Sequence, residues 1–156
     1  MKKLLITLFL LSTLSISGFS AGKNLTGVGI YGNLIGGGAG NFGTGIGLTL
    51  KFGNFPVLGA EWMFGDASRI AVSCDYWIVN DHLTGALNYY LGVGGFLGIG
   101  IAHDNAAIDF GGRIPIGLQI IPVNNFEIFA EFAPLVGFFP TLNLNFALRL
   151  GIRVHF

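Results

Sequence analysis

The last fourteen residues of the chain, 143–156, alternate strictly between large apolar side chains and small, polar or charged ones. The apolar positions are Leu144, Phe146, Leu148, Leu150, Ile152, Val154 and Phe156. Between them stand Asn143, Asn145, Ala147, Arg149, Gly151, Arg153 and His155. A period of two residues is typical of an extended strand whose two faces meet different surroundings. One face of this strand therefore requires hydrocarbon, and the other requires water or ionic partners.

The same alternation recurs along the whole chain, with turns or glycine-rich loops between the repeats. The predicted strands are 26–34, 43–52, 57–64, 69–79, 85–99, 108–121, 126–138 and 143–156. Tight turns are expected at 53–56, 80–82 and 122–125, and loops at 35–42, 65–68, 100–107 and 139–142. Pro115 and Pro134 lie inside two predicted strands. Because proline donates no ladder hydrogen bond, bulges or a shortened strand are expected there.

Composition decides what surrounds these strands. Only 10 % of the residues are charged and 52 % are hydrophobic, whereas a soluble domain carries about 25 % charged residues. No stretch after the N-terminus holds the ~20 apolar residues of a transmembrane helix. An open sheet would leave backbone groups unpaired in lipid, so the strands must close. The predicted fold class is therefore an all-β, eight-stranded antiparallel up-and-down transmembrane β-barrel.

The N-terminus predicts export. Lys2 and Lys3 precede a short apolar run that begins at Leu4, and small residues at 18 and 20 suit cleavage after Ser20. We expect residues 1–20 to be a cleaved signal peptide and residues 21–156 to be the outer-membrane barrel domain. Subtracting 20 from 156 leaves 136 residues, about 17 for each of eight strands and their connections. The expected location is the bacterial outer membrane, with both termini in the periplasm.

Charged side chains fall on the small-residue face, which in a closed barrel lines the lumen. The predicted lumen ion-pair network is Lys51, Glu61, Asp75, Arg113, Glu127, Glu131, Arg149 and Arg153, with Asp109 near the outer rim. If the last two strands pair about Pro140, Arg149 lies opposite Glu131 and Arg153 opposite Glu127, as favourable cross-strand neighbours. Side chains just fill the interior of an eight-stranded barrel, so a plugged lumen is predicted.

Other motifs carry weak signals. The string at 27–32 matches G-x-G-x-x-G of dinucleotide sites, but no helix follows it, and no cofactor is predicted. The three histidines lack ligand spacing and Cys74 is the only cysteine, so neither a metal site nor an internal disulfide is expected. Ser68 with His103 is a conceivable hydrolytic pair, but no catalytic residue is predicted and we expect no enzyme. The formal net charge of zero implies no nucleic-acid partner.

The leader, the eight alternating strands and the terminal Phe156 resemble the small outer-membrane barrel family of the OmpA membrane domain, OmpX and OmpW. The resemblance implies roles in envelope integrity, surface contact or small-solute passage. It also implies a C-terminal signal read by the barrel-assembly machinery, which maps onto Leu150, Ile152, Val154 and Phe156. The partners it implies are outer-membrane lipids, that machinery and periplasmic chaperones, and a monomer is expected.

The predicted function is therefore that of an integral outer-membrane β-barrel protein. Its role would be structural, in the envelope, and its lumen would be polar, ion-paired and plugged. Two alternatives stay open: a narrow channel for ions or small solutes, and an outer-membrane lipid-modifying enzyme.

Overall fold

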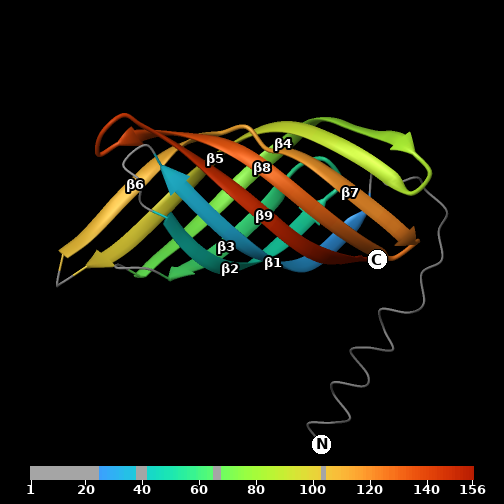
Figure 1. The fold of residues 1–156 in the computed structure, drawn as a ribbon, viewed down its shortest axis with the longest axis horizontal. Helices are drawn as coiled ribbons and strands as arrows, with labels where there is room; N and C mark the ends of the chain where they lie inside the picture. Colours follow the sequence, from blue (N-terminus) through green and yellow to red (C-terminus); the bar gives the residue numbers. More distant parts are fainter. Residues whose placement is uncertain (1–24, 38–41, 65–67, 103–104) are drawn as a thin grey trace, which may run out of the picture.

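The computed structural model describes residues 25–37, 42–64, 68–102 and 105–156, and these form a ring of antiparallel strands (Figure 1). The strands are β1 (Thr26–Gly37), β2 (Phe42–Phe52), β3 (Val57–Phe64), β4 (Ser68–Thr84), β5 (Leu87–Ala102), β6 (Asn105–Arg113), β7 (Ile116–Val123), β8 (Phe126–Phe139) and β9 (Asn143–His155). The predicted signal peptide, residues 1–20, and His103 lie outside the described residues. Among the residues described, no helix is long and apolar enough to cross a membrane.

The strands close into a complete ring. Consecutive strands pair from β1 to β5, and β9 pairs with both β8 and β1. Between β5 and β8, the ring is completed by β6 and β7, each of which pairs with both neighbours. Together β6 and β7 cross the barrel wall once, as one strand would, so the ring is equivalent to eight strands. The predicted eight-stranded antiparallel barrel is confirmed, and closure pairs the backbone groups that an open sheet would leave free.

One predicted strand, 108–121, is divided into β6 and β7 at Ile114 and Pro115. The backbone remains bonded at the break: Ile114 N–H donates to the Pro134 carbonyl at 3.1 Å, and Gly92 N–H donates to the Pro115 carbonyl at 2.8 Å. The N and O atoms of a strand residue point toward the same neighbouring strand. The nitrogen of Pro134, which carries no hydrogen, therefore faces the break between β6 and β7. A shortened strand is therefore found at Pro115, while Pro134 remains inside β8.

The predicted turn at 80–82 is wrong. Strand β4 continues to Thr84, and the chain reverses at Gly85, which adopts a positive φ of 56° that favours glycine. The ladder between β4 and β5 shifts register between Trp77 and Val79, which is a bulge. The extra residue changes which side chains point inward, and simple alternation did not reveal it.

Asn80 shows why the strand continues. The bulge turns its side chain to the inner face, where it is 6 % exposed. Its Nδ2 donates to Asn54 Oδ1 at 2.9 Å, and its Oδ1 accepts from Gln119 Nε2 at 2.7 Å. These bonds satisfy a polar group inside the barrel that would otherwise cost free energy to bury.

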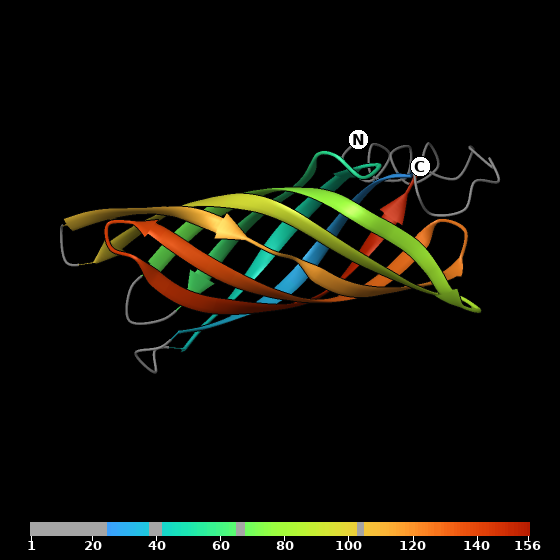
Figure 2. The same ribbon diagram turned by 90° about the horizontal axis from the view of Figure 1, so that it is seen from above.

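The barrel has two distinct ends (Figures 1 and 2). At the turn end lie the start of β1, the end of β9 and the turns after β2, β4 and β7. At the loop end lie the ends of β1, β3, β5 and β8. The loop predicted at 100–107 is shorter than expected, since β5 extends to Ala102 and β6 begins at Asn105. Figure 2 shows the strands running obliquely from one end to the other.

Candidate functional site: the barrel lumen

The ring separates two chemically different faces. Large apolar side chains point outward and are exposed, as Ile30 and Leu150 are at 57 % and 66 %. The eight charged residues predicted for the lumen lie on the inner face, each at most 9 % exposed. They are Lys51, Glu61, Asp75, Arg113, Glu127, Glu131, Arg149 and Arg153. The alternation of each strand places them there, because successive side chains point to opposite faces.

Nearest the turn end is a group that we call the turn-end cluster: Lys51, Glu127, Arg153 and His155. Glu127 is at its centre, fully buried. Its Oε1 accepts a hydrogen bond from Arg153 Nη1. Its Oε2 lies 2.7 Å from His155 Nε2 and 3.7 Å from Lys51 Nζ. One carboxylate therefore holds side chains from β2 and β9 together.

Aromatic rings fill the rest of this half of the lumen. Trp77 and Tyr90 stack with their centroids 3.9 Å apart, and both are fully buried. Lys51 Nζ lies 4.6 Å from the Trp77 ring centroid, and the Arg153 guanidinium lies 3.8 Å from that of Phe129. Cations over ring faces are attracted by the ring quadrupole, more strongly when water is excluded. Charged groups and aromatic rings thus pack together in this half of the lumen.

A glycine makes room for one of these rings. Any Cβ at Gly117 would overlap the ring of Tyr90, its neighbour across the β5–β7 ladder. Tyr90 then extends over the glycine, and its hydroxyl donates to Glu131 Oε2 at 2.9 Å. The small residue on one strand therefore positions a large polar ring from the next.

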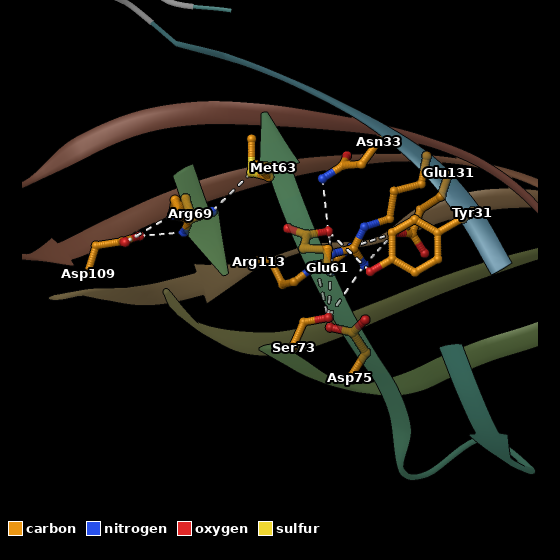
Figure 3. Close-up of polar contacts among 11 residues, drawn as sticks. Tyr31, Asn33, Glu61, Met63, Arg69, Ser73, Asp75, Asp109, Arg113 and Glu131 are labelled. Atoms are coloured by element: carbon orange, nitrogen blue, oxygen red, sulfur yellow. Dashed lines mark hydrogen bonds and ion pairs between the residues drawn. The ribbon is translucent and has the colours of Figure 1, made fainter. Parts of the chain in front are cut away.

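Further along the lumen is the middle cluster: Glu61, Asp75, Arg113, Glu131 and Arg149. Figure 3 labels the first four of these residues. Arg113 Nη2 donates to Glu131 Oε1, and Arg113 Nε lies 3.5 Å from Asp75 Oδ1. Arg149 Nη2 donates to Glu61 Oε2 at 2.9 Å, whereas its Nη1 is 3.5 Å from Glu131 Oε1. The cluster joins β3, β4, β6, β8 and β9 across the barrel.

The predicted register of the last two strands is confirmed: Glu131 pairs with Arg149, and Glu127 with Arg153. The ion pairs follow it only partly. Arg153 bonds its cross-strand neighbour, but Arg149 makes its shorter contact with Glu61 on β3. A closed barrel turns side chains toward a common axis, so an arginine can reach a strand that is not its neighbour. The pairing of neighbouring strands does not by itself identify the partner of Arg149.

Glu61 collects donors from two other strands. Its Oε2 accepts from Tyr31 Oη at 3.1 Å, from Asn33 Nδ2 at 2.8 Å and from Arg149 Nη2 at 2.9 Å. A Cβ at Gly47 would overlap the Tyr31 ring, so the glycine makes room for this ring as Gly117 does for Tyr90. One oxygen of Glu61 therefore accepts hydrogen bonds from side chains of β1 and β9.

At the loop end a further ion pair, the rim pair, joins Arg69 to Asp109. Arg69 Nη2 lies 2.5 Å from Asp109 Oδ2, and Arg69 Nε donates to Asp109 Oδ1 at 3.0 Å. Their side chains are 22 % and 31 % exposed. Arg69 was not among the predicted lumen residues, although its sequence parity with Ser73 and Asp75 was an available signal. Figure 3 shows this pair set apart from the contacts around Glu61.

The two halves of the lumen differ in open space. A cavity of about 480 Å³ lies toward the loop end, and we call it the vestibule. Its polar lining consists of Glu61, Arg69, Ser73, Asp109, Arg113, Asn145 and Arg149. Its apolar lining includes Ile35, Phe42, Met63, Phe96, Leu135 and Ala147. Beneath it, beside Thr49, Phe129 and Arg153, a void measures only about 10 Å³. That is room for at most about one water molecule.

Other predicted features are placed as follows. Leu150, Ile152, Val154 and Phe156 of the predicted C-terminal signal all point outward, between 38 % and 66 % exposed. Ser68 accepts a hydrogen bond from Trp62 Nε1 at 3.0 Å, and its suggested partner His103 is outside the described residues. Within the described part of the chain, no group of three or more His, Cys, Asp or Glu residues is arranged to hold a metal ion.

No protein-family model matches the sequence, and no curated protein matches it significantly. Solved structures do match by fold. Neisserial surface protein A aligns with a TM-score of 0.54 and 12 % identity over 85 % of this chain and 96 % of that one. The N-terminal β-barrel domain of Pseudomonas aeruginosa OprF gives 0.52 and 16 % over 83 % and 97 %. Ail, the attachment invasion locus protein of Yersinia pestis, gives 0.53 and 16 % over 88 % and 100 %.

These likenesses cover nearly the whole of each solved barrel and most of this chain. With the closed ring and its apolar outer face, they establish that the chain has the fold of the small OmpA- and OmpX-like outer-membrane β-barrels.

Proposed function

We propose that this protein is an integral β-barrel of a bacterial outer membrane, with a structural role in the envelope, no enzymatic activity and a plugged lumen. The observation that carries the proposal is the closed ring with exposed apolar side chains outside and paired charges inside. In water that outer face would expose apolar surface on all sides, which soluble monomers rarely do. In a lipid bilayer the apolar outer face contacts hydrocarbon, and the backbone groups of every strand are paired with neighbouring strands.

The similar solved structures support the outer-membrane location, since they are small barrels from bacterial surfaces. The two tryptophans offer a direct test. Trp62 points outward and is 52 % exposed, whereas Trp77 is fully buried in the lumen. In vesicles of brominated phospholipid, we expect the emission of a Trp77→Phe variant, which retains Trp62, to be strongly quenched. The matched Trp62→Phe variant should be quenched little, and equal quenching would contradict the proposed faces.

The plugged lumen rests on the turn-end cluster and the stacked rings of Trp77 and Tyr90. Below the vestibule they leave a void of about 10 Å³. A continuous water-filled path needs more than isolated room for one water molecule. In planar bilayers the refolded protein should therefore show no discrete channel openings. Regular single-channel steps would contradict the plugged lumen and favour the alternative, a narrow channel for ions or small solutes.

Assembly is the remaining part of the proposal. Leu150, Ile152, Val154 and Phe156 form an outward apolar row on the strand that closes the ring against β1. We propose that the barrel-assembly machinery reads this row after chaperones deliver the chain, and that the folded barrel is a monomer in outer-membrane lipid. Deleting Phe156 should lower the folded fraction in cells more than it lowers refolding in detergent. Phe52→Ala, at an outward site 46 % exposed on β2, is the control.

A further inference from the structure

The vestibule opens at the loop end, where the rim pair is partly exposed, and encloses about 480 Å³. Binding sites for small molecules typically enclose about 300–1,000 Å³ and combine apolar walls with a few polar groups. We propose that the vestibule binds a small organic ammonium. Its charged group would lie against Glu61, and its apolar body against the wall that contains Phe96 and Leu135.

The charges of the loop-end half favour a cation. Counted as ionised, the rim pair and the middle cluster together contain three guanidinium groups and four carboxylates. The turn-end cluster has the opposite balance, because Lys51 and Arg153 share the carboxylate of Glu127. The loop-end half therefore carries one negative charge that its own arginines do not neutralise. Inside a low-dielectric wall, such a charge attracts a cation more strongly than it would in water.

Glu61 offers an acceptor that the protein leaves free. Its side chain is buried and lines the vestibule, and the three side-chain hydrogen bonds that it accepts all reach Oε2. Its other oxygen, Oε1, is not one of the fully buried polar atoms that lack a partner among the described residues, so it retains surface that a ligand can reach. In the view of Figure 3, this oxygen lies on the side of the carboxylate toward Arg69.

The donors of the middle cluster are not available in the same way. Arg113 Nη1 and Arg149 Nε also lack a partner among the described residues, but both are fully buried. The side chain of Asp109, in contrast, is 31 % exposed, and a carboxylate can accept further hydrogen bonds beyond the two from Arg69. A ligand that brings donors therefore finds reachable acceptors in the vestibule.

The walls indicate that the cation carries an apolar body. Leu135 and Ala147 form a small buried cluster against which Phe96 packs, and all three line the vestibule. The Arg69 guanidinium lies 5.9 Å from the Phe96 ring centroid, so this ring already faces one cation. An aromatic face attracts ammonium groups in the same manner. An ammonium attached to a ring or a short alkyl chain matches both parts of the lining.

The experiment uses 4-fluorobenzylammonium as the probe and the refolded full barrel in zwitterionic detergent, followed by fluorine NMR. We expect saturable binding of this probe and much weaker binding of 4-fluorobenzoate, which has the same ring and the opposite charge. Empty micelles at the same detergent concentration report partitioning of each probe. Equal or tighter binding of the benzoate would overturn the proposed ligand class.

Two glycines of β5 give matched variants that test the location. Gly100 lines the vestibule, and a Cβ there would have only the Ala107 carbonyl oxygen nearby, at 3.9 Å. Gly100→Leu should fill the space and abolish saturable binding. Gly95 is outward-facing and pairs with exposed Cys74, so Gly95→Leu adds the same side chain on the other face and should leave binding intact. Equal binding by the two variants would place the ligand elsewhere.

Glu61→Gln tests the contact itself. It should weaken binding of 4-fluorobenzylammonium about tenfold, the factor expected for one charge-assisted hydrogen bond. Glu131→Gln removes the same charge from the middle cluster, but its oxygens are engaged by Arg113 and Tyr90, and it should weaken binding less. Equal losses would contradict a contact with Glu61.

The rim pair tests the sign of the charge effect at a site where folding is expected to tolerate substitution. Asp109→Asn removes a reachable carboxylate and should lower the affinity for 4-fluorobenzylammonium about two- to fivefold, whereas Arg69→Gln should raise it by a similar factor. Changes in the same direction would overturn the proposal. Binding is measured in detergent and channel openings in planar bilayers, so failure of this site and failure of the plugged lumen are distinguishable.

Discussion

The two halves of the lumen are built from the same alternating pattern and the same kinds of ion pair, yet they are filled differently. Around Glu127 the charges are fully buried and stacked rings occupy the space between them. Around Asp109 the pair is 22 % and 31 % exposed and borders a cavity of about 480 Å³. The comparison shows that the side chains around an ion pair decide whether it is buried or accessible to solvent. The chemistry of the pair itself does not decide this.

Strand β5 shows where the difference arises. Its inner face carries Tyr90 toward the turn end and Gly100 toward the loop end, where a Cβ would have only the Ala107 carbonyl oxygen nearby. A packed interior needs side chains whose volumes sum to the available space. Tyr90 supplies that volume and Gly100 does not, so space remains at the loop end. The following predictions, from the largest effect to the smallest, test this contrast.

The largest effect is expected at the turn-end cluster. Glu127→Ala leaves Arg153, Lys51 and His155 without their shared carboxylate in a fully buried site. Breaking a buried ion pair by removing one partner costs about 3–5 kcal/mol. Urea unfolding of the refolded barrel in detergent should show a loss of that size. A loss no greater than that of Asp109→Ala would remove the distinction between the two halves.

The second largest effect is expected from steric crowding, which should make a glycine-to-alanine substitution more destabilising in the turn-end half than in the loop-end half. Gly117→Ala places a methyl group into the ring of Tyr90 and is expected to destabilise the barrel by about 1–3 kcal/mol. Gly100→Ala meets only a carbonyl oxygen at 3.9 Å and should change stability little. Both are the same substitution on inner faces, compared by the same urea titration. Equal losses would show that the loop-end half is as tightly packed as the turn-end half.

The middle cluster tests which partner Arg149 uses. Its contact with Glu61 is 2.9 Å, and its contact with the cross-strand neighbour Glu131 is 3.5 Å. Double-mutant cycles of alanine substitutions should give a larger coupling energy for Glu61 and Arg149, within the range of about 0.5–3 kcal/mol for residues in contact. A larger coupling for Glu131 would mean that cross-strand register dominates over reach across the lumen.

The smallest effect is expected at the rim pair. Asp109→Ala removes a partly exposed ion pair, which is worth about 0.2–1 kcal/mol and is weakened by salt. The loss measured by urea unfolding should therefore shrink as ionic strength rises. The loss caused by Glu127→Ala should respond to salt much less, because water and ions do not reach that site.

Much of this was predictable from residue order. Alternation placed all eight predicted charged residues inside, and the pairing of Arg149 with Glu131 followed from a hairpin about Pro140. Alternation failed where it met an irregularity: the bulge after Trp77 carried β4 past the predicted turn at 80–82. A bulge inserts one residue into a strand and shifts the alternation of inward and outward side chains beyond it. A search for a fixed period of two residues does not detect this shift. Arg69 was missed although it shares the inward parity of its strand.

The sequence by itself determined the two faces, the number of crossings and the need for closure. Those properties follow from local rules: side chains alternate along a strand, and unpaired backbone is costly in lipid. Only the tertiary structure decided that Arg149 reaches Glu61, that Trp77 stacks on Tyr90 and that the loop-end half stays open. Each depends on side chains from strands far apart in the chain that meet at a common axis. Their meeting is set by the closed ring's geometry and by summed volume, which no single strand encodes.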